Sequence, residues 1–495
     1  MRKYLLGIDN GNTVSKSTLF DLNGHVIASA SSKVQTLYPF PGWSERNMEE
    51  LWKSNVSNIR KVIKKSGIKP AEIIAVGGTG HGNGLYLIDK FGKPLKAIQS
   101  LDSRCGQVVQ EWKDSGLQEK VFPFTHQYFW ASQTNSLLSW MKRYDSQTYH
   151  KIGAVLLCKD YINWCLTGEI ATDSTDISAT NLFDLKNETY SDELLRLYDL
   201  QDIMPFLPKV VKSHDQIGIV SKKAATETGL LPHTPVVAGM LDVQAGMIGS
   251  GVIETGQLSV VAGTWSVNSL LMNELPNDPK IAMCSLSALP NNKYLAIEAS
   301  ATSVSNLEWY LNQFGHEERK VAKKLGVSVH QVCDDSVLKC DTPSEVIFHP
   351  FLFGSSTHAH LRAGFYGLAG WHSKRDMLRA IYEGIAFSHL SHIEKLTKYR
   401  NNGGVILTGG GSKSPVLSQY FSDILGCGIE IPSQQESGTW GAAMAAGIGT
   451  GIYANYGQAL DKSVRIIKKY ESNPKTFESY RSLYKQYGQI LDCMR

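Results

Sequence analysis

The sequence has few cysteines, and they form no pattern that would bind a metal or build a disulfide framework. Eight cysteines are scattered over 495 residues, and no C-x-x-C pair occurs. Zinc sites and disulfide-rich folds depend on closely and regularly spaced cysteines. We therefore expect reduced thiols and a cytoplasmic location.

An excess of charge and a long hydrophobic run are also missing. Fifty Lys and Arg residues face 46 Asp and Glu residues, a net charge of +4 that is too balanced for coating nucleic acid or acidic lipid. The first apolar stretch, residues 4–8, is shorter than the about 7–15 residues of a signal-peptide core. The Gly-rich segment 437–460 is too polar for a good spanning helix. We expect no nucleic-acid partner, no membrane contact and a small-molecule ligand.

The common nucleotide-binding loops are absent as well. The sequence has no GxxxxGK[ST], and the glycines at 78–84 lack the GxGxxG spacing, which argues against P-loop and Rossmann folds. Tight turns with outward-facing amides can bind phosphate instead. Gly11, Asn12 and Thr13 form one such turn, to which Lys16 adds a charge, and Gly263 with Thr264 forms the second. Either turn alone is more often structural, but the pair favours phosphate binding.

Length and periodicity indicate an α/β protein of two large parts. A chain of 495 residues exceeds one ordinary core, and strand and helix patterns alternate along it. The predicted strands span residues 4–9, 15–20, 25–31, 73–77, 234–241, 257–262 and 405–408. The predicted helices span residues 48–66, 135–143, 155–167, 307–314 and 378–385. A hairpin opens each half, so we predict domains at 1–247 and 248–495.

Two carboxylates stand at the ends of apolar strands. Asp9 and Asp242 each follow such a run, and ligands of open α/β sheets bind at the carboxyl ends of strands. One carboxylate could hold Mg²⁺ while the other accepts a proton from a hydroxyl, the division of labour that phosphoryl transfer needs. A helix N-cap is the structural alternative for Asp242.

Five stretches resemble the motifs of a known family. In chain order they are Leu6-Gly-Ile-Asp-Asn-Gly-Asn-Thr13 with Lys16; Pro41-Gly-Trp-Ser-Glu45; Lys159-Asp-Tyr161 with Leu166-Thr-Gly168 and Thr172-Asp173; Ala363-Gly-Phe-Tyr-Gly-Leu368 with residues 376–384; and Thr408-Gly-Gly-Gly-Ser412 with Glu436 and Gly441-Ala-Ala443. By these motifs the chain is identified as a member of the FGGY carbohydrate kinase family over essentially its whole length.

This resemblance implies an actin-like ATPase fold, in which two ribonuclease-H-like domains flank a cleft for nucleotide and sugar. The N-terminal domain would bind the sugar and the C-terminal domain ATP, with Mg²⁺. Asp242 would be the catalytic base and also touch the substrate, while Asp9 would organise Mg²⁺. Phosphate contacts would come from the two turns with Lys16, and the adenosine pocket from Gly410, Gly411 and Ser414.

The residues of two loops indicate which sugar the protein acts on. Xylulose kinases resemble one another at G-Q-M-H-G, which here is Gly80-His-Gly-Asn-Gly84, while the family's N-D-x-R keeps Asp102 and Arg104. Residues 82–90 with 100–104, and also 306–309 and 350–355, look closest to the L-xylulose kinase branch. His81, Asn83, Asp102 and Arg104 would then be sugar contacts. We expect phosphorylation of the terminal hydroxyl of a ketopentose such as L-xylulose. D-Xylulose, gluconate, erythritol and autoinducer-2 remain alternatives, as does a non-catalytic actin-like sugar sensor; a homodimer is left open.

Overall fold

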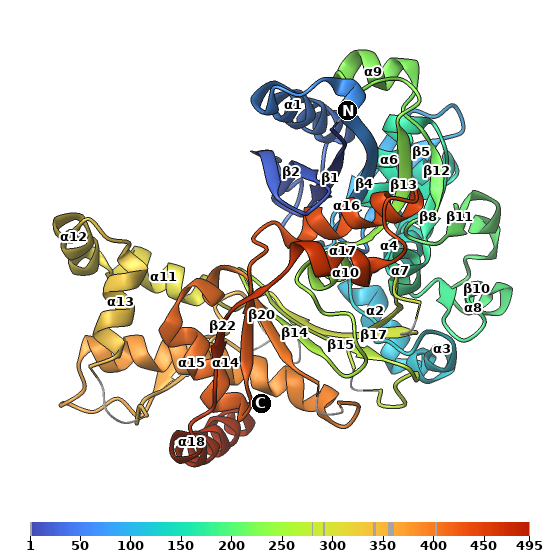
Figure 1. The fold of residues 1–495 in the computed structure, drawn as a ribbon. Helices are drawn as coiled ribbons and strands as arrows, with labels where there is room; N and C mark the ends of the chain where they lie inside the picture. The colour runs from blue at the N-terminus through green and yellow to red at the C-terminus, as the bar shows by residue number, and fades with distance from the viewer. Residues whose placement is uncertain are drawn as a thin grey trace. The chain divides into compact units, whose positions relative to one another are not determined.

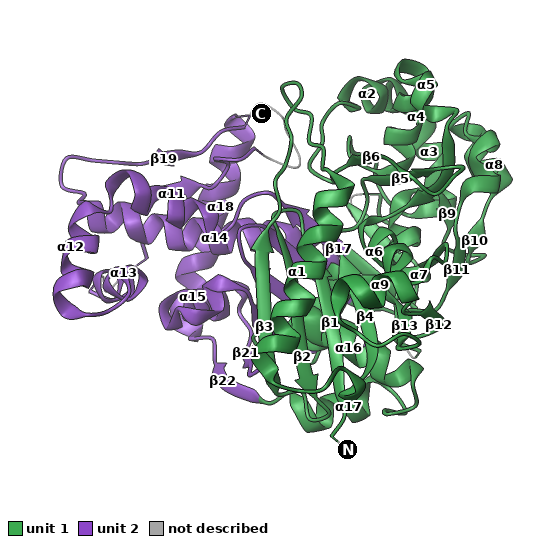
Figure 2. Ribbon diagram, turned by 90° about the horizontal axis from the view of Figure 1, so that it is seen from above, with its two compact units in different colours: residues 1–253, 271–296, 434–465 green, residues 254–270, 297–433, 466–495 purple. Residues whose placement is uncertain are grey.

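The structure is a computed structural model that describes residues 2–279, 281–290, 293–339, 343–354, 361–400 and 403–494. Two compact units divide the chain: unit 1 comprises residues 1–253, 271–296 and 434–465, and unit 2 the remaining stretches (Figure 2). Within the described part of the chain, no helix is long and apolar enough to cross a membrane. The described cysteines are all free; Cys340 lies outside the described residues.

A six-stranded sheet forms the centre of unit 1 (Figure 1). Its order is β12-β13-β4-β1-β2-β3, from β1 (Tyr4–Asn10), β2 (Val14–Asp21), β3 (Val26–Lys33), β4 (Ile73–Gly80), β12 (Gln216–Ile219) and β13 (Pro235–Leu241). Strands β1, β2 and β3 are an antiparallel meander, and β4 and β13 continue the sheet in parallel. Strand β12 pairs antiparallel with β13 at the edge of this sheet.

Helices cover both faces of this sheet. Helices α1 (Met48–Ser66) and α6 (Cys158–Thr167) bury the apolar side chains of one face, and α10 (Asp242–Gly249) and α16 (Ser437–Gly449) pack on the other. Successive residues of β4 face opposite sides of the sheet. A Cβ on Gly77 would meet Ala442 O of α16, whereas a Cβ on the next residue, Gly78, would approach Asn163 Oδ1 of α6 on the other side. Helix α17 (Tyr456–Ser463) follows α16.

Residues 85–211 add a second apolar core to unit 1. Its strands and short pairs are β5 (Leu85–Asp89), β6 (Pro94–Ile98), β7 (Ile152–Leu156), β8 (Ala171–Asp173), β9 (Phe183–Asp184), β10 (Thr189–Tyr190) and β11 (Lys209–Val211). Its helices are α2 (Gly106–Asp114), α3 (Leu117–Thr125), α4 (Thr134–Tyr144), α5 (Ser146–Tyr149), α7 (Ser174–Ile177) and α8 (Asp192–Leu197). Helix α9 (Lys222–Thr228) and strand β16 (Met283–Leu286) complete unit 1.

In the second large sheet, the central strands β17-β15-β14-β20-β21 repeat the order β3-β2-β1-β4-β13 of the first sheet. Its strands are β14 (Leu258–Ala262), β15 (Ser266–Met272), β17 (Tyr294–Ser300), β20 (Val405–Thr408), β21 (Ile429–Pro432) and β22 (Ile466–Tyr470), which lie wholly or partly in unit 2, and β16 of unit 1 at the edge beside β17. The helices of unit 2 are α11 (Ser305–Phe314), α12 (His316–Leu325), α13 (Val329–Val337), α14 (Lys374–Thr397), α15 (Pro415–Leu425) and α18 (Pro474–Cys493), and β18 (Ile347–His349) pairs with β19 (Gly364–Tyr366). The predicted doubled α/β pattern is thereby confirmed.

Most predicted elements lie where the periodicity put them, and one does not. The helix at 48–66 and the strand at 405–408 have the predicted bounds, and Gly67 ends the helix in the left-handed conformation. The predicted helix at 155–167 is wrong at its start: residues 152–156 form β7, and the helix begins at Cys158. Pairing with β5 buries this apolar run as a strand, an outcome that periodicity alone does not decide. The boundary at residue 247 stays a prediction; α10 runs through it.

The closeness of α16 to the sheet predicts that Gly7 is essential to unit 1. A Cβ on Gly7 would lie 2.0 Å from Thr439 O, a backbone atom that cannot rotate away. Gly7→Ala should therefore lower the free energy of unfolding by about 1–3 kcal/mol, the usual cost of overpacking. Urea denaturation followed by circular dichroism measures this. Gly106→Ala is the control, since its Cβ meets nothing within 4 Å, and an equal effect of both changes would contradict the argument.

Candidate active site

The turn between β1 and β2 holds the first predicted phosphate contacts. Gly11 N donates to Val14 O at 3.0 Å and closes the turn. The Gly11 carbonyl accepts from Arg46 Nη1 and Nη2 at 3.3 and 3.4 Å, and the Asn12 carbonyl also accepts from Arg46 Nη2. Thr13 is exposed at the tip of the turn. The turn is thus held from one side and open at its tip.

Asp9 lies one residue before the end of β1 rather than at its end, because Asn10 continues the strand. Burial raises the pKa of Asp9 to about 6; Lys16 works against this shift and Glu436 adds to it. Lys16 Nζ pairs with Glu436 Oε2 at 2.9 Å. A Cβ on Gly438, in the first turn of α16, would lie 3.0 Å from Asp9 Oδ2, so a larger residue there would have to displace this carboxylate slightly.

Asp242 is the first residue of α10, directly after β13. Its Oδ1 accepts the N–H of Val243 at 2.7 Å, which uses part of the carboxylate in the first turn of the helix. Burial and then the charge of Asp9 raise the pKa of Asp242 to about 7, against the lowering effect of that hydrogen bond. Two neighbouring carboxyl groups with raised pKa values can divide proton transfer and cation binding between them.

The His81 imidazole is buried in the predicted sugar segment, residues 80–84. His81 Nε2 lies 2.9 Å from Tyr86 Oη and Nδ1 lies 3.2 Å from Ser100 Oγ. Burial, followed by the charge of Arg46, lowers the pKa of His81 to about 3, which keeps the ring neutral. A neutral imidazole can both donate and accept, as a contact to a sugar hydroxyl requires.

The other predicted sugar contacts bond mainly to the protein itself. Asn83 Nδ2 donates to Ala179 O at 3.1 Å, and its Oδ1 accepts from Thr134 N at 3.3 Å. Asp102 and Arg104 form a fully buried ion pair at 2.8 Å. Their direct contact with a sugar stays a prediction, because these atoms already have partners.

The Asp102–Arg104 pair supports a neighbouring loop. Arg104 Nη2 also pairs with Glu45 Oε1 at 2.8 Å, and its guanidinium lies 3.9 Å from the ring centroid of Trp43. Asp102 Oδ2 accepts the N–H of Ser44 at 2.6 Å. These contacts fix the Pro41–Glu45 motif against the sugar segment.

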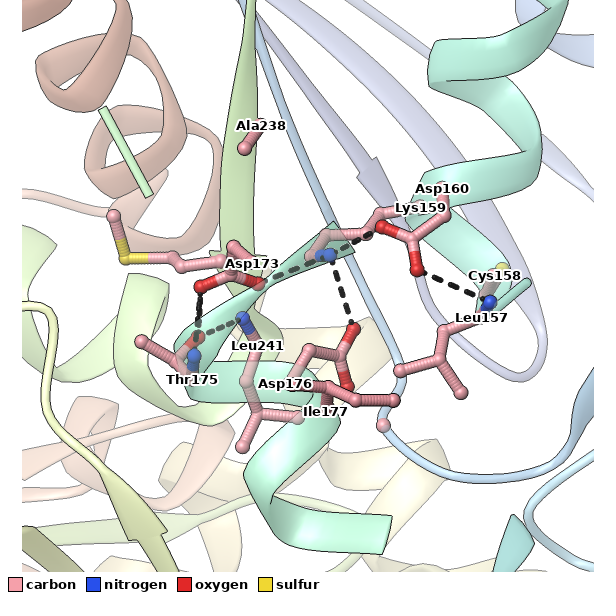
Figure 3. A network of polar contacts seen from close by, with 12 residues as sticks. Leu157, Cys158, Lys159, Asp160, Asp173, Thr175, Asp176, Ile177, Ala238 and Leu241 are labelled. Atoms are coloured by element: carbon pink, nitrogen blue, oxygen red, sulfur yellow. Dashed lines mark hydrogen bonds and ion pairs between the residues drawn. The ribbon is translucent and has the colours of Figure 1, made fainter. Parts of the chain in front are cut away.

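A buried charge network lies beneath the end of β13 (Figure 3). Lys159 Nζ is 2.5 Å from Asp160 Oδ1, 3.0 Å from Asp173 Oδ1 and 3.5 Å from Asp176 Oδ2. Burial, opposed by Lys159, raises the pKa of Asp176, and the charges of its acidic neighbours raise it further. Thr175 Oγ1 donates to Asp173 at 2.6 Å and accepts the N–H of Leu241 at 3.0 Å. The network therefore fixes the backbone directly before Asp242.

In unit 2, the second predicted turn borders a cavity of about 490 Å³. Gly263 and Thr264 of the β14–β15 turn line it together with Gly410, while α11 supplies Ser305, Glu308, Trp309 and Asn312. The structure thus joins two of the predicted nucleotide-binding segments in one cavity of a size suited to a ligand.

Gly411 and Ser414 have other positions. Gly411 is buried and does not line this cavity; a Cβ on it would approach Ala262 Cβ to 2.9 Å. Ser414 Oγ accepts from Leu417 N at the start of α15 and bonds to Asp334 Oδ1 at 2.8 Å. The structure gives Ser414 a capping function, and its contact with adenosine stays a prediction.

Four side chains around the first turn were not predicted: Arg46, Tyr86, Gln99 and Ser100. Gln99 Nε2 donates to the Asn12 carbonyl at 2.8 Å, and Asn12 Nδ2 to Ser100 Oγ at 3.0 Å. Arg46 directly follows the Pro41–Glu45 motif, and this adjacency is the signal that could have found it. The remaining contacts join residues far apart in sequence.

The residues around Asp9 fit a magnesium ion. Among the described side chains, none donates a hydrogen bond to the Asp9 carboxylate, which is partly exposed. The described residues contain no cluster of three or more His, Cys, Asp or Glu side chains that would enclose a metal. Mg²⁺ suits such a place, because it prefers oxygen ligands and keeps several waters beside one or two carboxylates.

Residues 4–249 match the N-terminal domain of the FGGY family of carbohydrate kinases, and residues 258–450 match its C-terminal domain. The chain belongs to this family. As an FGGY kinase it is a phosphotransferase that acts on a carbohydrate with ATP as the phosphate donor.

Curated relatives cover the FGGY kinase from end to end. A "Probable L-xylulose kinase" of Pasteurella multocida is 34% identical over 99% of both chains. An "L-xylulose/3-keto-L-gulonate kinase" of Escherichia coli is 32% identical over 100% of this chain and 98% of its own.

Solved structures agree on the fold. The gluconate kinase of Lactobacillus acidophilus superposes with a TM-score of 0.90 at 24% identity, covering 100% of this chain and 98% of that one. Ligand-bound xylulose kinase of the same organism gives 0.91 at 23% identity over 99% and 98%. The expected actin-like α/β fold is confirmed.

The raised pKa of Asp242 predicts a cost in stability. A carboxyl whose pKa is higher in the folded state loses stabilisation as pH rises from about 4 to about 7, because the folded state holds the proton more tightly. Asp242→Asn removes this loss. Without ligands at pH 8, the variant should gain about 1–2 kcal/mol after allowance for partial exposure, seen as a higher Tm by scanning calorimetry. The gain should shrink toward pH 5.

Asp145→Asn is the matched control with the opposite sign. Hydrogen bonds from Thr148 and Lys96 outweigh burial and lower the pKa of Asp145, so its replacement should lower the Tm at pH 8. A Tm of Asp242→Asn at or below that of the wild type at pH 8 contradicts the prediction.

Proposed function

We propose that this FGGY kinase transfers the γ-phosphoryl group of ATP to the terminal hydroxyl of L-xylulose. The choice of L-xylulose is supported by the full-length identity of 32–34% with relatives named as L-xylulose kinases. Polar groups dominate the segment around His81, as a substrate without an apolar face requires.

Asp242 is proposed as the general base. It accepts the proton of the sugar hydroxyl while the oxygen of that hydroxyl bonds to the γ-phosphorus and the bond to ADP breaks. A pKa of about 7 suits this task, because such a carboxylate is ionised for part of the time at neutral pH and is basic enough to take a proton.

Asp9 is proposed to organise Mg²⁺, with Asp242 as the neighbouring carboxylate. When bound, the ion neutralises charge on the phosphates. The free amides of Asn12 and Thr13 then bind the terminal phosphate, while Gly11, whose own amide donates to Val14 O, shapes the turn. Lys16, already paired with Glu436, adds a positive charge to this side of the turn.

For the nucleotide we propose the unit 2 cavity. Gly263 closes the turn through its own amide, which donates to Trp265 O at 3.1 Å, and Thr264 offers its backbone amide to phosphate. Gly410 lets the nucleotide approach the end of β20. Gly411 acts beneath the surface, where its missing Cβ lets the glycine run pack on Ala262. Ser414 is the weakest member of this set, since its hydroxyl is engaged in capping α15.

For the sugar we propose direct contact with His81 and Asn83. The ion pair of Asp102 and Arg104 stabilises the loops around them. We also propose that the enzyme works in the cytoplasm, where ATP is present and its free thiols stay reduced. A sugar sensor could dispense with its base, so Asp242 favours the kinase over that alternative.

A substrate panel tests the proposed sugar. ADP release should be measured by a coupled assay with L-xylulose, 3-keto-L-gulonate, D-xylulose, gluconate, erythritol and autoinducer-2. L-Xylulose should give a kcat/KM at least about tenfold above that for D-xylulose, a difference of about 1.4 kcal/mol in transition-state stabilisation. A higher kcat/KM for any other member of the panel rejects L-xylulose as the substrate.

Asp242→Asn tests the base. The amide can still donate to or accept from the hydroxyl but cannot take its proton, so kcat should fall by about 10²–10⁴-fold. ATP affinity should stay near the wild-type value, because the cavity that we propose for ATP is built from other residues. Steady-state kinetics with calorimetric ATP binding measures both. A variant that keeps more than about a tenth of kcat rules out this role, and Asp102 is then the next carboxylate to replace.

A further inference from the structure

Arg46 is a buried cation without an acidic partner. Arg46 is 4% exposed, and no carboxylate of the described residues lies within 4.0 Å of its guanidinium. The other two arginines that are buried among the described residues are paired, Arg104 with Asp102 and Arg379 with Glu383. An uncompensated buried charge is costly, and the cost falls when an anion binds close by.

The contacts of Arg46 orient the first phosphate turn. Its guanidinium holds the carbonyl oxygens of Gly11 and Asn12. In a planar trans peptide the C=O and the next N–H point in opposite directions. The N–H groups of Asn12 and Thr13 therefore point away from Arg46. Neither of these amides donates to an acceptor among the described residues. The turn thus presents two free donors backed by a positive charge.

The position of Arg46 is itself fixed. Its backbone N–H donates to Ala97 O at 3.1 Å, and the residue before it, Glu45, is tied to Arg104 at 2.8 Å. Gln99 N also donates to Ser44 O at 2.8 Å. The guanidinium is therefore a rigid support for the turn, as a positioning residue has to be.

Arg46 also reaches the predicted sugar segment. Its Nη1 donates to Tyr86 Oη at 3.4 Å, and because a guanidinium has no acceptor, the hydroxyl must accept this bond. The hydroxyl hydrogen is then available to His81 Nε2 at 2.9 Å, which assigns the imidazole proton to Nδ1. One side chain thus contacts the phosphate turn and orients the histidine proposed for the sugar.

We propose that Arg46 is a positioning residue for phosphoryl transfer: it holds the Gly11–Asn12 carbonyls so that the next two amides face the transferred phosphoryl group, whose negative charge balances the buried guanidinium. This inference rests on the proposed function of the turn as the site of the terminal phosphate.

Nucleotide binding gives a test that does not need turnover. Isothermal titration should compare ADP with a non-hydrolysable ATP analogue, adenylyl imidodiphosphate, in the presence of Mg²⁺. The wild type should prefer the analogue by at least about tenfold, because only it carries the third phosphate. Arg46→Gln should reduce this preference to about threefold or less with ADP affinity unchanged. A variant that keeps the wild-type preference overturns the proposal.

Kinetics of conservative and non-conservative variants separates positioning from structure. Arg46→Gln should lower kcat by about 10²-fold, near the loss for a misplaced transition-state donor. Sugar KM should rise by a smaller factor, because Arg46 reaches His81 only through Tyr86. Arg46→Lys should recover part of kcat, because it keeps the charge but cannot hold both carbonyls. Gln99→Leu, which removes a neutral partner of the same Asn12 carbonyl, should lower kcat by less than Arg46→Gln does. Equal loss in Arg46→Lys and Arg46→Gln, or a kcat within about threefold of wild type, contradicts the role.

The two hypotheses fail differently. If the wild type phosphorylates no sugar of the panel, the proposed substrate is wrong, while the nucleotide comparison still decides the role of Arg46. If the wild type is active and Arg46→Gln, folded by circular dichroism, keeps both its kcat and its preference for the ATP analogue, the role of Arg46 is wrong and the proposed function stands.

Discussion

The close packing of α16 on β1 and β4 is the contact on which the site in unit 1 depends. Gly7 and Gly77 let the helix backbone approach the strands, and Gly441 does the same for α10, where a Cβ would lie 2.1 Å from Ala245 O. This approach places Gly438 beside Asp9 and lets Glu436 pair with Lys16. Bulkier residues at these positions would separate α16 from the carboxylate it flanks, so the glycines determine the electrostatics of the site.

Around this contact, unit 1 gathers charges that a folded protein ordinarily avoids burying. Asp9 and Asp242 share one region at the cost of raised pKa values, and Lys159 offsets only part of the charge of the three aspartates around it. Such groupings are stable only when packing elsewhere exceeds their cost. Perturbed pKa values of this kind are typical of functional sites.

The sequence predicted local elements well because local signals determine them. The helix at 48–66 has an amphipathic pattern and a terminal glycine, and the strand at 405–408 is a short apolar run before glycines. The ends of apolar strands pointed to Asp9 and Asp242, and the paired hairpins pointed to both turns. Contacts between distant segments were not predictable: Lys16 and Glu436 are 420 positions apart, and Arg46 meets the turn through tertiary packing. The start of α6 was misjudged because an apolar run suits a strand and a helix equally.

Unit 1 is built from segments that lie far apart in the chain, and this affects the order in which the protein folds during synthesis. Its sheet is complete once residue 241 has been made, but α16 and α17 belong to residues 434–465. At about 5–20 residues per second, translation leaves the α16 face of that sheet without its helix for roughly 10–40 seconds. The glycine-lined strands are exposed for that time, so a nascent chain that pauses before residue 434 presents an apolar surface to chaperones.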